Sequence, residues 1–263
     1  FSLPLFCSNL LQQVYNLTDT ALAGHLLGSA ALAEIGATAA LYGLIMNFAF
    51  GMNNGLALTV SRCFGAGERE GIRRAVGWMV TLSAAVSIVL TTVSLLGRGA
   101  LLQVLQVPAE VWDGAAAYLT VILLGIPLTM LYNMEAALLR AVGNSVTPLL
   151  FLLFSSVLNV GLDAAFMGPL GMGVRGAAVA TVLAQGISAV LGAVYLVRSY
   201  PELHFTLAHL KKSARRAVMN MFWAGMSMGL MSAIYNLGSV ALQSSITVSY
   251  THLRAHETLA NLV

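Results

Sequence analysis

Long apolar stretches alternate with short polar ones along this chain of 263 residues. A helix that crosses the hydrocarbon core of a membrane needs about 20 mostly apolar residues, because each residue rises about 1.5 Å against a core of about 30 Å. Apolar and polar residues do not alternate at every second position, as they do in the strands of a membrane barrel. The pattern predicts an all-α, polytopic bundle with seven transmembrane helices: Phe1–Gly24, Ala37–Cys63, Ala75–Leu96, Val111–Leu139, Val146–Met167, Val174–Val197 and Val218–Val248.

The composition supports a protein that lies in a lipid bilayer. Apolar side chains make up 58% of the chain and charged ones only 9%, whereas soluble domains carry about 25% charged residues. This excludes a cytosolic enzyme and a disordered regulator. The formal net charge is only +3, which is too small for a nucleic-acid-binding face, so no nucleic-acid partner is expected.

Basic residues gather in the loops on one side of the predicted bundle. Ten of the 13 follow the second, fourth and sixth stretches, and only Arg98 and Arg175 lie in the opposite loops. Cytoplasmic loops of membrane proteins carry such an excess of Lys and Arg. We therefore expect the side with ten basic residues to face the cytoplasm.

A short internal repeat indicates two copies of a six-helix unit. The first stretch contains Tyr15-Asn-Leu-Thr-Asp-Thr-Ala-Leu22 and the seventh contains Tyr235-Asn-Leu-Gly-Ser-Val-Ala-Leu242, with five of eight positions identical. An even number of helices keeps both copies in the same orientation, an arrangement known in transporters. We expect a six-helix N-terminal lobe over residues 1–197, a cytoplasmic linker over 198–217, and the first helix of a truncated second lobe over 218–248.

The two ends do not resemble natural protein termini. No initiating Met or basic residue precedes the first apolar stretch, which indicates a clipped N-terminus rather than a signal peptide. After Val248 the apolar pattern gives way to Ser249-Tyr-Thr-His-Leu-Arg-Ala-His-Glu-Thr258, which resembles translated sequencing-adapter read-through. We expect residues 249–263 to be a non-native tail.

Three carboxylates, Asp19, Glu135 and Asp163, lie within the predicted spans, apart from Asp113 at the very start of the fourth. Each is expected to have a role, because a charged side chain at a helix centre costs about 2.5–3.5 kcal/mol on insertion scales. Asp19 and Asp163 lie at a similar depth, with Asn159 one turn before Asp163 and Thr181 on the sixth helix. Two carboxylates, an amide and a hydroxyl form an all-oxygen set that suits a proton or a hard cation such as Na⁺. Alternatively, these groups only hydrogen-bond the helices together.

Other polar residues give weaker indications. Gln12 and Tyr15 share one face of the first helix with Asp19, since residues three and four apart are neighbours on a helix. Pro4 removes a backbone hydrogen bond from this helix and allows it to bend. The third carboxylate, Glu135, lies five residues before Arg140, so an interfacial ion pair is an equal alternative to a functional role.

Four stretches are similar to the multidrug and toxic compound extrusion (MATE) transporters of bacteria. They are residues 10–24 of the first helix, the loop Gly65-Ala-Gly-Glu-Arg-Glu-Gly-Ile-Arg-Arg74, the loop Leu139-Arg-Ala-Val-Gly-Asn-Ser-Val-Thr-Pro148, and Asn159-Val-Gly-Leu-Asp163. The resemblance extends over about Phe1–Val248.

This resemblance implies a fold and a set of site residues. It implies twelve helices in two six-helix lobes, of which five helices are absent here, and drug efflux driven by inward movement of H⁺ or Na⁺. It implies a helix-bending role for Pro4 and no cofactor or metal beyond the coupling ion. The implied cation-binding residues are Asp19, Asn159, Asp163 and Thr181, and the implied cavity residues are Gln12, Tyr15 and Asn133.

The expected protein is thus a transporter, not an enzyme, that exports amphipathic, often cationic compounds across a bacterial inner membrane and is a monomer at full length. One alternative is a lipid-linked saccharide flippase of the same superfamily, but the predicted spans carry no basic residues between their ends for a pyrophosphate. Another is an intramembrane enzyme, but every His lies in a predicted loop, linker or tail.

Overall fold

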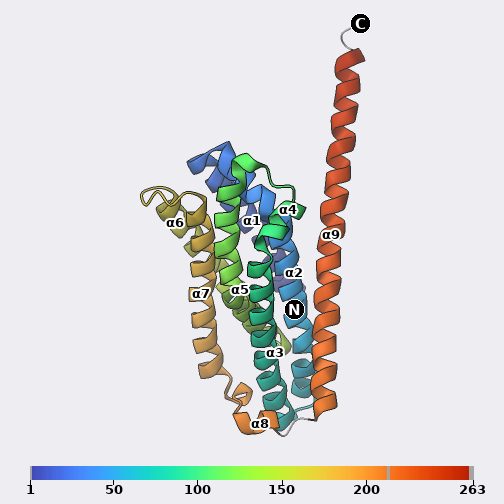
Figure 1. Cartoon of the computed structure of the whole chain (residues 1–263). Helices are drawn as coiled ribbons and strands as arrows, with labels where there is room; N and C mark the ends of the chain where they lie inside the picture. The colour runs from blue at the N-terminus through green and yellow to red at the C-terminus, as the bar shows by residue number, and fades with distance from the viewer. Residues whose placement is uncertain (1, 212–213, 261–263) are drawn as a thin grey trace.

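The computed structural model describes residues 2–211 and 214–260, with side chains except those of residues 2, 4, 5, 9, 16, 207 and 240–260. These ranges contain helices and no strand. The long helices lie side by side (Figure 1), which confirms the predicted all-α bundle. They are α1 (Ser2–Leu27), α2 (Ser29–Gly65), α3 (Arg69–Leu96), α5 (Trp112–Ala141), α6 (Val146–Met167), α7 (Val174–Ser199) and α9 (Arg215–Ala260).

Six helices in the described ranges are long and apolar enough to cross a membrane. The exception among the long helices is α1, although its 26 residues give it sufficient length. Its polar residues Gln12, Gln13 and Asp19 dilute its apolar character. The first of the seven predicted spans is therefore a helix of spanning length that is less apolar than the other six.

The connection between α1 and α2 is shorter than the sequence pattern predicts. A loop was expected between Gly24 and Ala37, yet α2 begins at Ser29, and Gly28 alone separates the two helices with a φ of +84°. The Ala-rich segment after Gly28 contains no proline, and alanine is the strongest helix former. With 37 residues, α2 is roughly 55 Å long and exceeds the hydrocarbon core.

Short helices lie in two of the other connections: α4 (Arg98–Val104) and η1 (Ala109–Val111) between α3 and α5, and η2 (Pro201–Leu203) and α8 (Leu207–Lys211) between α7 and α9. The last two lie in the predicted linker, at the same end of the bundle as the α2–α3 turn (Figure 1). Phe205 and Leu210 pack against Gly77 of α3 so closely that a Cβ there would lie 2.9 Å from the Phe205 ring. The segment that contains η2 and α8 is thereby held against α3.

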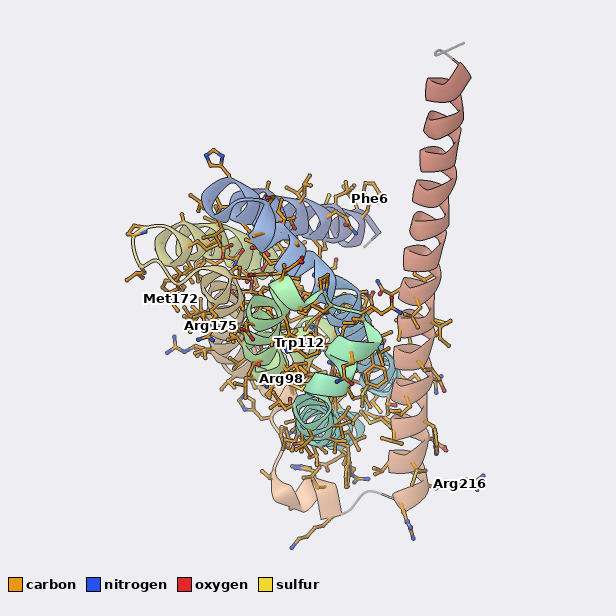
Figure 2. The ribbon with its side chains drawn as sticks, turned by 45° about the horizontal axis from the view of Figure 1, so that its top comes forward. Phe6, Arg98, Trp112, Met172, Arg175 and Arg216 are labelled. Carbon is orange, nitrogen blue, oxygen red and sulfur yellow. The ribbon has the colours of Figure 1, made fainter. Side chains whose placement is uncertain are left out.

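The basic residues separate between the two ends as expected. Figure 2 shows Arg216, at the start of α9, far from Arg98 and Arg175, which lie at the other end of the bundle. There, Arg98 donates a 2.6 Å hydrogen bond to the Thr120 hydroxyl. The structure therefore places these basic residues at opposite ends of the bundle, and the cytoplasmic side stays a prediction.

Glycines allow α2 and α9 to approach each other closely. Gly51 and Gly55 of α2 face Gly225 and Gly229 of α9, and each pair has the spacing Gly-x-x-x-Gly. A Cβ at Gly55 would lie 2.5 Å from the carbonyl oxygen of Ala224, and one at Gly51 would collide with the α9 backbone. Small residues at this spacing are typical of membrane helices that pack closely.

Beyond this crossing, α9 extends past the other helices (Figure 1). Its helical backbone continues to Ala260, through most of the segment predicted to be a non-native tail. The side chains of that segment and the whole of residues 261–263 lie outside the described part of the chain. The assignment of residues 249–263 as foreign therefore stays a prediction.

Candidate functional site

Asp19 and Asp163 lie next to each other where α1 packs against α6. The two helices are neighbours in the bundle, and each carboxyl group lies within interacting distance of the other. Asp163 is fully buried, whereas Asp19 is half-buried. The structure thus brings together two intramembrane carboxylates that are 144 positions apart in the sequence (163 − 19).

Asn159 and Thr181 complete a polar cluster around Asp163. Asn159 lies one turn before Asp163 on α6, and its Nδ2 donates to Thr181 Oγ1 of α7 at 3.4 Å. The Thr181 hydroxyl in turn donates to the carbonyl oxygen of Ala177 at 3.0 Å. Tyr15 of α1 lies against Thr181 and also interacts with both aspartates. We call Asp19, Asn159, Asp163 and Thr181 the aspartate cluster.

The aspartate cluster holds several buried oxygen atoms with no hydrogen-bond donor. They are Oδ1 of Asp19, Oδ1 of Asn159 and both carboxylate oxygens of Asp163. Ionised carboxylates only accept hydrogen bonds, so two of them cannot satisfy each other. A proton or a hard cation between them would satisfy both, and oxygen is the ligand that hard cations prefer. These residues therefore fit H⁺ or Na⁺.

A metal that requires sulfur or nitrogen ligands has no comparable site in the described ranges. No three side chains of His, Cys, Asp or Glu come together there in a metal-binding arrangement. The aspartate cluster contributes two carboxylates only, with an amide and a hydroxyl beside them. Its composition fits a singly charged ion better than a transition metal.

A cavity of about 650 Å³ lies beside the aspartate cluster. Its walls include the three residues predicted to line a cavity, Gln12, Tyr15 and Asn133, together with Asp19. The other three members of the aspartate cluster are fully or almost fully buried behind this wall. Asp19 is therefore the member of the aspartate cluster that meets both the cavity and the buried polar groups.

The cavity also contains polar and aromatic residues that the sequence did not single out. Thr129 of α5 and Gln185 of α7 share a hydrogen bond at its wall. The amides Gln185 and Asn236 could have been found as polar residues within spans. The tyrosines gave no such signal, because a single Tyr in an apolar run is typical of a packed core. Among the additional lining residues are Tyr42, Tyr118, Thr129, Tyr132, Gln185 and Asn236.

Pro4 and Pro127 lie within two of the helices of the site. Pro4 lies in α1, whose backbone is helical through this position, but its side chain is outside the described set. Its role in bending stays a prediction. Pro127 lies inside α5, two residues before the cavity residue Thr129, and the sequence reasoning overlooked it. A proline inside a helix removes a hydrogen bond and permits a kink.

The alternative for Glu135, an ion pair with Arg140, does not form among the described residues. Arg140 instead donates a 3.1 Å hydrogen bond to Asn54 Oδ1 of α2, and its guanidinium lies 5.6 Å from the centre of the Phe50 ring. Glu135 is buried elsewhere, and its Oε2 has no hydrogen-bond partner. Arg140 therefore ties α5 to α2 and leaves Glu135 without a counter-ion.

Comparisons with curated proteins identify multidrug resistance proteins as relatives. The chain is 28% identical over 253 residues to "Probable multidrug resistance protein YpnP" of Bacillus subtilis, covering 96% of this chain and 56% of that protein. It is 28% identical over 225 residues to the NorM protein of Thermotoga maritima, covering 84% of this chain and 48% of that protein. The chain thus spans about half the length of these relatives.

Solved structures show the same arrangement of helices. A crystal structure of MATE in the straight conformation matches with a TM-score of 0.83 at 27% identity, covering 95% of this chain and 55% of that one. An inward-facing structure of a multidrug resistance MATE family transporter matches with a TM-score of 0.79 at 26% identity, covering 86% and 51%. The bundle therefore has the fold of one half of such transporters.

The match to a family model covers the helices that carry most of the site. The model of the MatE family matches residues 4–165, a range that includes Asp19, Asn159 and Asp163 and most of the cavity wall. This range is more than half of the chain. The chain belongs to the MatE family.

Proposed function

We propose that the chain is the first lobe, with the first helix of the second, of a monomeric antiporter in a bacterial inner membrane. The full-length transporter exports amphipathic, often cationic compounds in exchange for inward H⁺ or Na⁺, with no other cofactor. The position of Asp19 carries this proposal, because Asp19 lines the cavity and also interacts with the buried Asp163. An ion that binds there changes the charge of the cavity wall itself.

Exchange of substrate for cation follows because the cationic substrate and H⁺ or Na⁺ compete for the negative charge of the aspartate cluster. When the cluster is empty of cations, Asp19 presents a negative charge to the cavity and attracts a cationic substrate. When H⁺ or Na⁺ binds between Asp19 and Asp163, the cation takes up the charge of Asp19 while one negative charge stays with the buried Asp163, and this draws α1 toward α6. The substrate then loses its counter-charge, and α1, which supplies Gln12 and Tyr15 to the wall, changes the shape of the cavity.

The charge of the cavity favours cationic substrates over lipid-linked pyrophosphates. Among its described lining residues, Asp19 carries the only charge. A pyrophosphate group is bound by Arg, Lys or backbone amide groups, and none of the lining residues is basic. This supports drug export rather than flipping of a lipid-linked saccharide.

Expression of the full-length transporter in a bacterium that lacks its own drug exporters tests the proposal. We expect reduced accumulation of a cationic dye such as ethidium, and restored accumulation when the gradients of H⁺ and Na⁺ are collapsed. Equal accumulation with and without the transporter would contradict the proposed function.

The hydroxyl of Thr181 should contribute measurably to cation binding. In Thr181→Val, the Nδ2 group of Asn159 loses the acceptor that it has at 3.4 Å, and a lost hydrogen bond is worth about 1 kcal/mol, or roughly five-fold in affinity. The cation concentration for half-maximal dye efflux should rise by that factor. Thr181→Ser keeps the hydroxyl and should stay near wild type, and equal behaviour of the two variants would count against the assignment.

A further inference from the structure

Glu135 is a second buried carboxyl group, separate from the aspartate cluster. It lies on α5 with 4% of its surface exposed, inside a helix that is apolar enough to cross a membrane. Its Oε2 has no hydrogen-bond partner. An ionised carboxylate in such a place is costly, so the neutral, protonated form is the one that this environment favours.

The facing surface of α7 leaves room for this carboxyl group. A Cβ at Gly192 would collide with Oε2 of Glu135, so a larger residue there would force the carboxyl end of Glu135 to shift. Ser188 lies one turn before Gly192, is fully buried, and its hydroxyl also has no partner. Two polar groups without partners, one on each helix, thus lie beside the same interface of α5 and α7.

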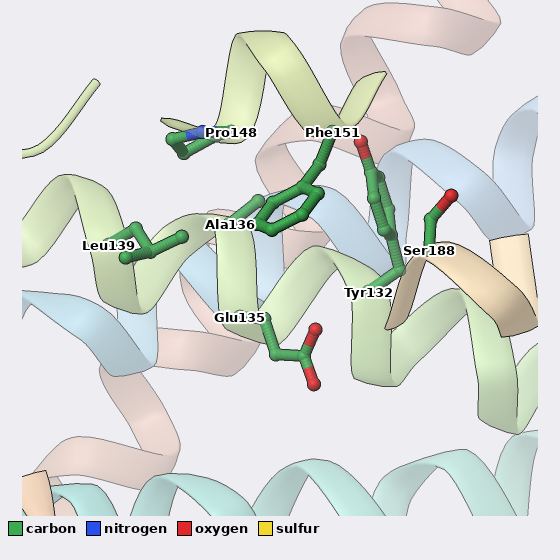
Figure 3. A pocket seen from close by; sticks show the side chains of 7 residues that line it. All are labelled: Tyr132, Glu135, Ala136, Leu139, Pro148, Phe151 and Ser188. Carbon is green, nitrogen blue, oxygen red and sulfur yellow. The ribbon is translucent and has the colours of Figure 1, made fainter. Parts of the chain in front are cut away.

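A small pocket connects these groups. It has a volume of about 10 Å³, which is at the lower limit of the space that one water molecule occupies. Figure 3 shows Glu135 and Tyr132 one turn apart on α5, with Ser188 beside Tyr132 and with Pro148 and Phe151 from α6 closing the pocket. In this view the Glu135 carboxyl points away from the hydroxyls of both Ser188 and Tyr132, in agreement with the unpartnered Oε2 of Glu135 and hydroxyl of Ser188, so a bridging water molecule is needed to join Tyr132 to Glu135.

The surroundings of Glu135 contain few groups that could exchange charge with it. On α5 these are Tyr132 and, further along the helix, Arg140. The positive charge of Arg140 interacts with Tyr132, but its guanidinium donates its hydrogen bond to Asn54. The residues of α7 that face Glu135 are Ser188 and Gly192. Those of α6 are Pro148 and Phe151. The ring of Tyr195, also on α7, packs edge-on against the Phe151 ring. None of these facing groups is an acid or a base paired with Glu135.

Tyr132 links this pocket to the large cavity. Its side chain lines both the Glu135 pocket and the 650 Å³ cavity that contains Asp19. A tyrosine hydroxyl both donates and accepts hydrogen bonds. It can therefore pass a proton between water in the cavity and the small pocket without itself being ionised at the end of the transfer.

We propose that Glu135 is a second proton-binding site of this lobe, filled and emptied through Tyr132 and a single water molecule in the Glu135 pocket. The bound species is a proton, because one carboxylate in a pocket of this size cannot hold a hydrated metal ion. A hydronium ion in the cavity gives a proton to the Tyr132 hydroxyl oxygen as that hydroxyl gives its own proton to the pocket water, which passes one on to Oε1 or Oε2 of Glu135. Tyr132 and the pocket water thus end with the protons they began with, and release reverses these steps. This inference rests on the proposed function and adds a second titrating group to the transport cycle.

Dye efflux from liposomes that contain the full-length transporter tests this site. We expect Glu135→Gln to lower efflux driven by a pH gradient about 10-fold, within the range of coupling between separate sites, and to flatten its dependence on pH. Dye binding should stay within about two-fold of wild type, since Glu135 does not line the large cavity. Glu110→Gln is the matched control, because Glu110 is an exposed carboxylate in η1 outside both pockets.

A steric variant tests the same site without changing its chemistry. Gly192→Ala places a methyl group where Oε2 of Glu135 lies, so the carboxyl end must shift, and pH-driven efflux should fall in the same direction as with Glu135→Gln but by less. Adding Glu135→Asp, which shortens the side chain by one methylene, should restore part of the activity. Infrared spectra should show a protonated carboxyl band that Glu135→Gln removes and Glu110→Gln leaves.

The outcomes separate this inference from the proposed function. If the wild-type transporter shows no gradient-driven efflux, the proposed function fails. If wild type transports and Asp163→Asn does not, but Glu135→Gln keeps both the wild-type pH profile and the carboxyl band, the Glu135 site alone is wrong.

Discussion

Asp163→Asn should abolish cation-driven drug efflux by the full-length transporter while leaving its folding intact. The amide has the shape of the carboxyl group but can neither bind a proton nor neutralise a cation, and Asp163 is fully buried beside Asp19. Efflux should fall by at least about 100-fold, the lower end of what positioned proton transfer contributes. Dye accumulation in a drug-sensitive bacterium measures this loss, with membrane insertion checked by the amount of protein in the membrane fraction.

Asp113→Asn provides the matched control for this loss. Asp113 is exposed near the start of α5, away from the cavity and the aspartate cluster, so the same chemical change there should leave efflux unaltered. Asp19→Asn should resemble Asp163→Asn. Undiminished efflux in both cluster variants would show that the aspartate cluster only joins helices, the alternative that the sequence left open.

The largest structural effect is expected at the crossing of α2 and α9. A Val side chain at Gly55 would collide with the backbone of Ala224 and Gly225, which forces the two helices apart. Such overpacking costs about 1–3 kcal/mol, and a double Gly51→Val and Gly55→Val variant should lose more than either single change. Thermal unfolding of the full-length transporter in detergent measures the loss as a lower midpoint.

Gly36→Val is the control that separates the clash between α2 and α9 from the effect of replacing a glycine by valine within a helix. Gly36 lies on the same helix, but a Cβ there would meet nothing within 4 Å. This variant should unfold near the wild-type temperature. If Gly36→Val and Gly55→Val shift the midpoint equally, close approach of α2 and α9 is not what these glycines provide.

The sequence pattern predicted the ends of a helix well where a long apolar stretch has polar residues at both ends. The stretches Val146–Met167 and Val174–Val197 became α6 and α7 with ends that differ by two residues at most. It failed at Gly28, where a loop was expected, because an Ala-rich segment has too little hydropathy to count as a span and yet forms helix readily. Hydropathy indicates which residues favour the lipid, not which residues form a helix, so the hydropathy pattern underestimated the length of α2.

The candidate site was predicted where a rare residue type gave the signal. Asp19 and Asp163 stood out because carboxylates are uncommon in spans, and the structure places them together. Tyr42 and Tyr118 line the same cavity but look like core residues in the sequence. The Gly-x-x-x-Gly spacings were visible as well, yet nothing in the sequence says that Gly55 faces Gly225, because the pairing of helices depends on their arrangement in space.

The central claim is that drug and cation exchange through the aspartate cluster, and reversal of an imposed ion gradient tests it most directly. Liposomes with the full-length transporter are loaded with dye and exposed to a gradient of H⁺ or of Na⁺. We expect at least one gradient to drive dye movement against its own concentration difference, and reversing that gradient to reverse the direction of dye movement. Dye movement that follows only its own concentration difference, whatever the ion gradient, would contradict coupling.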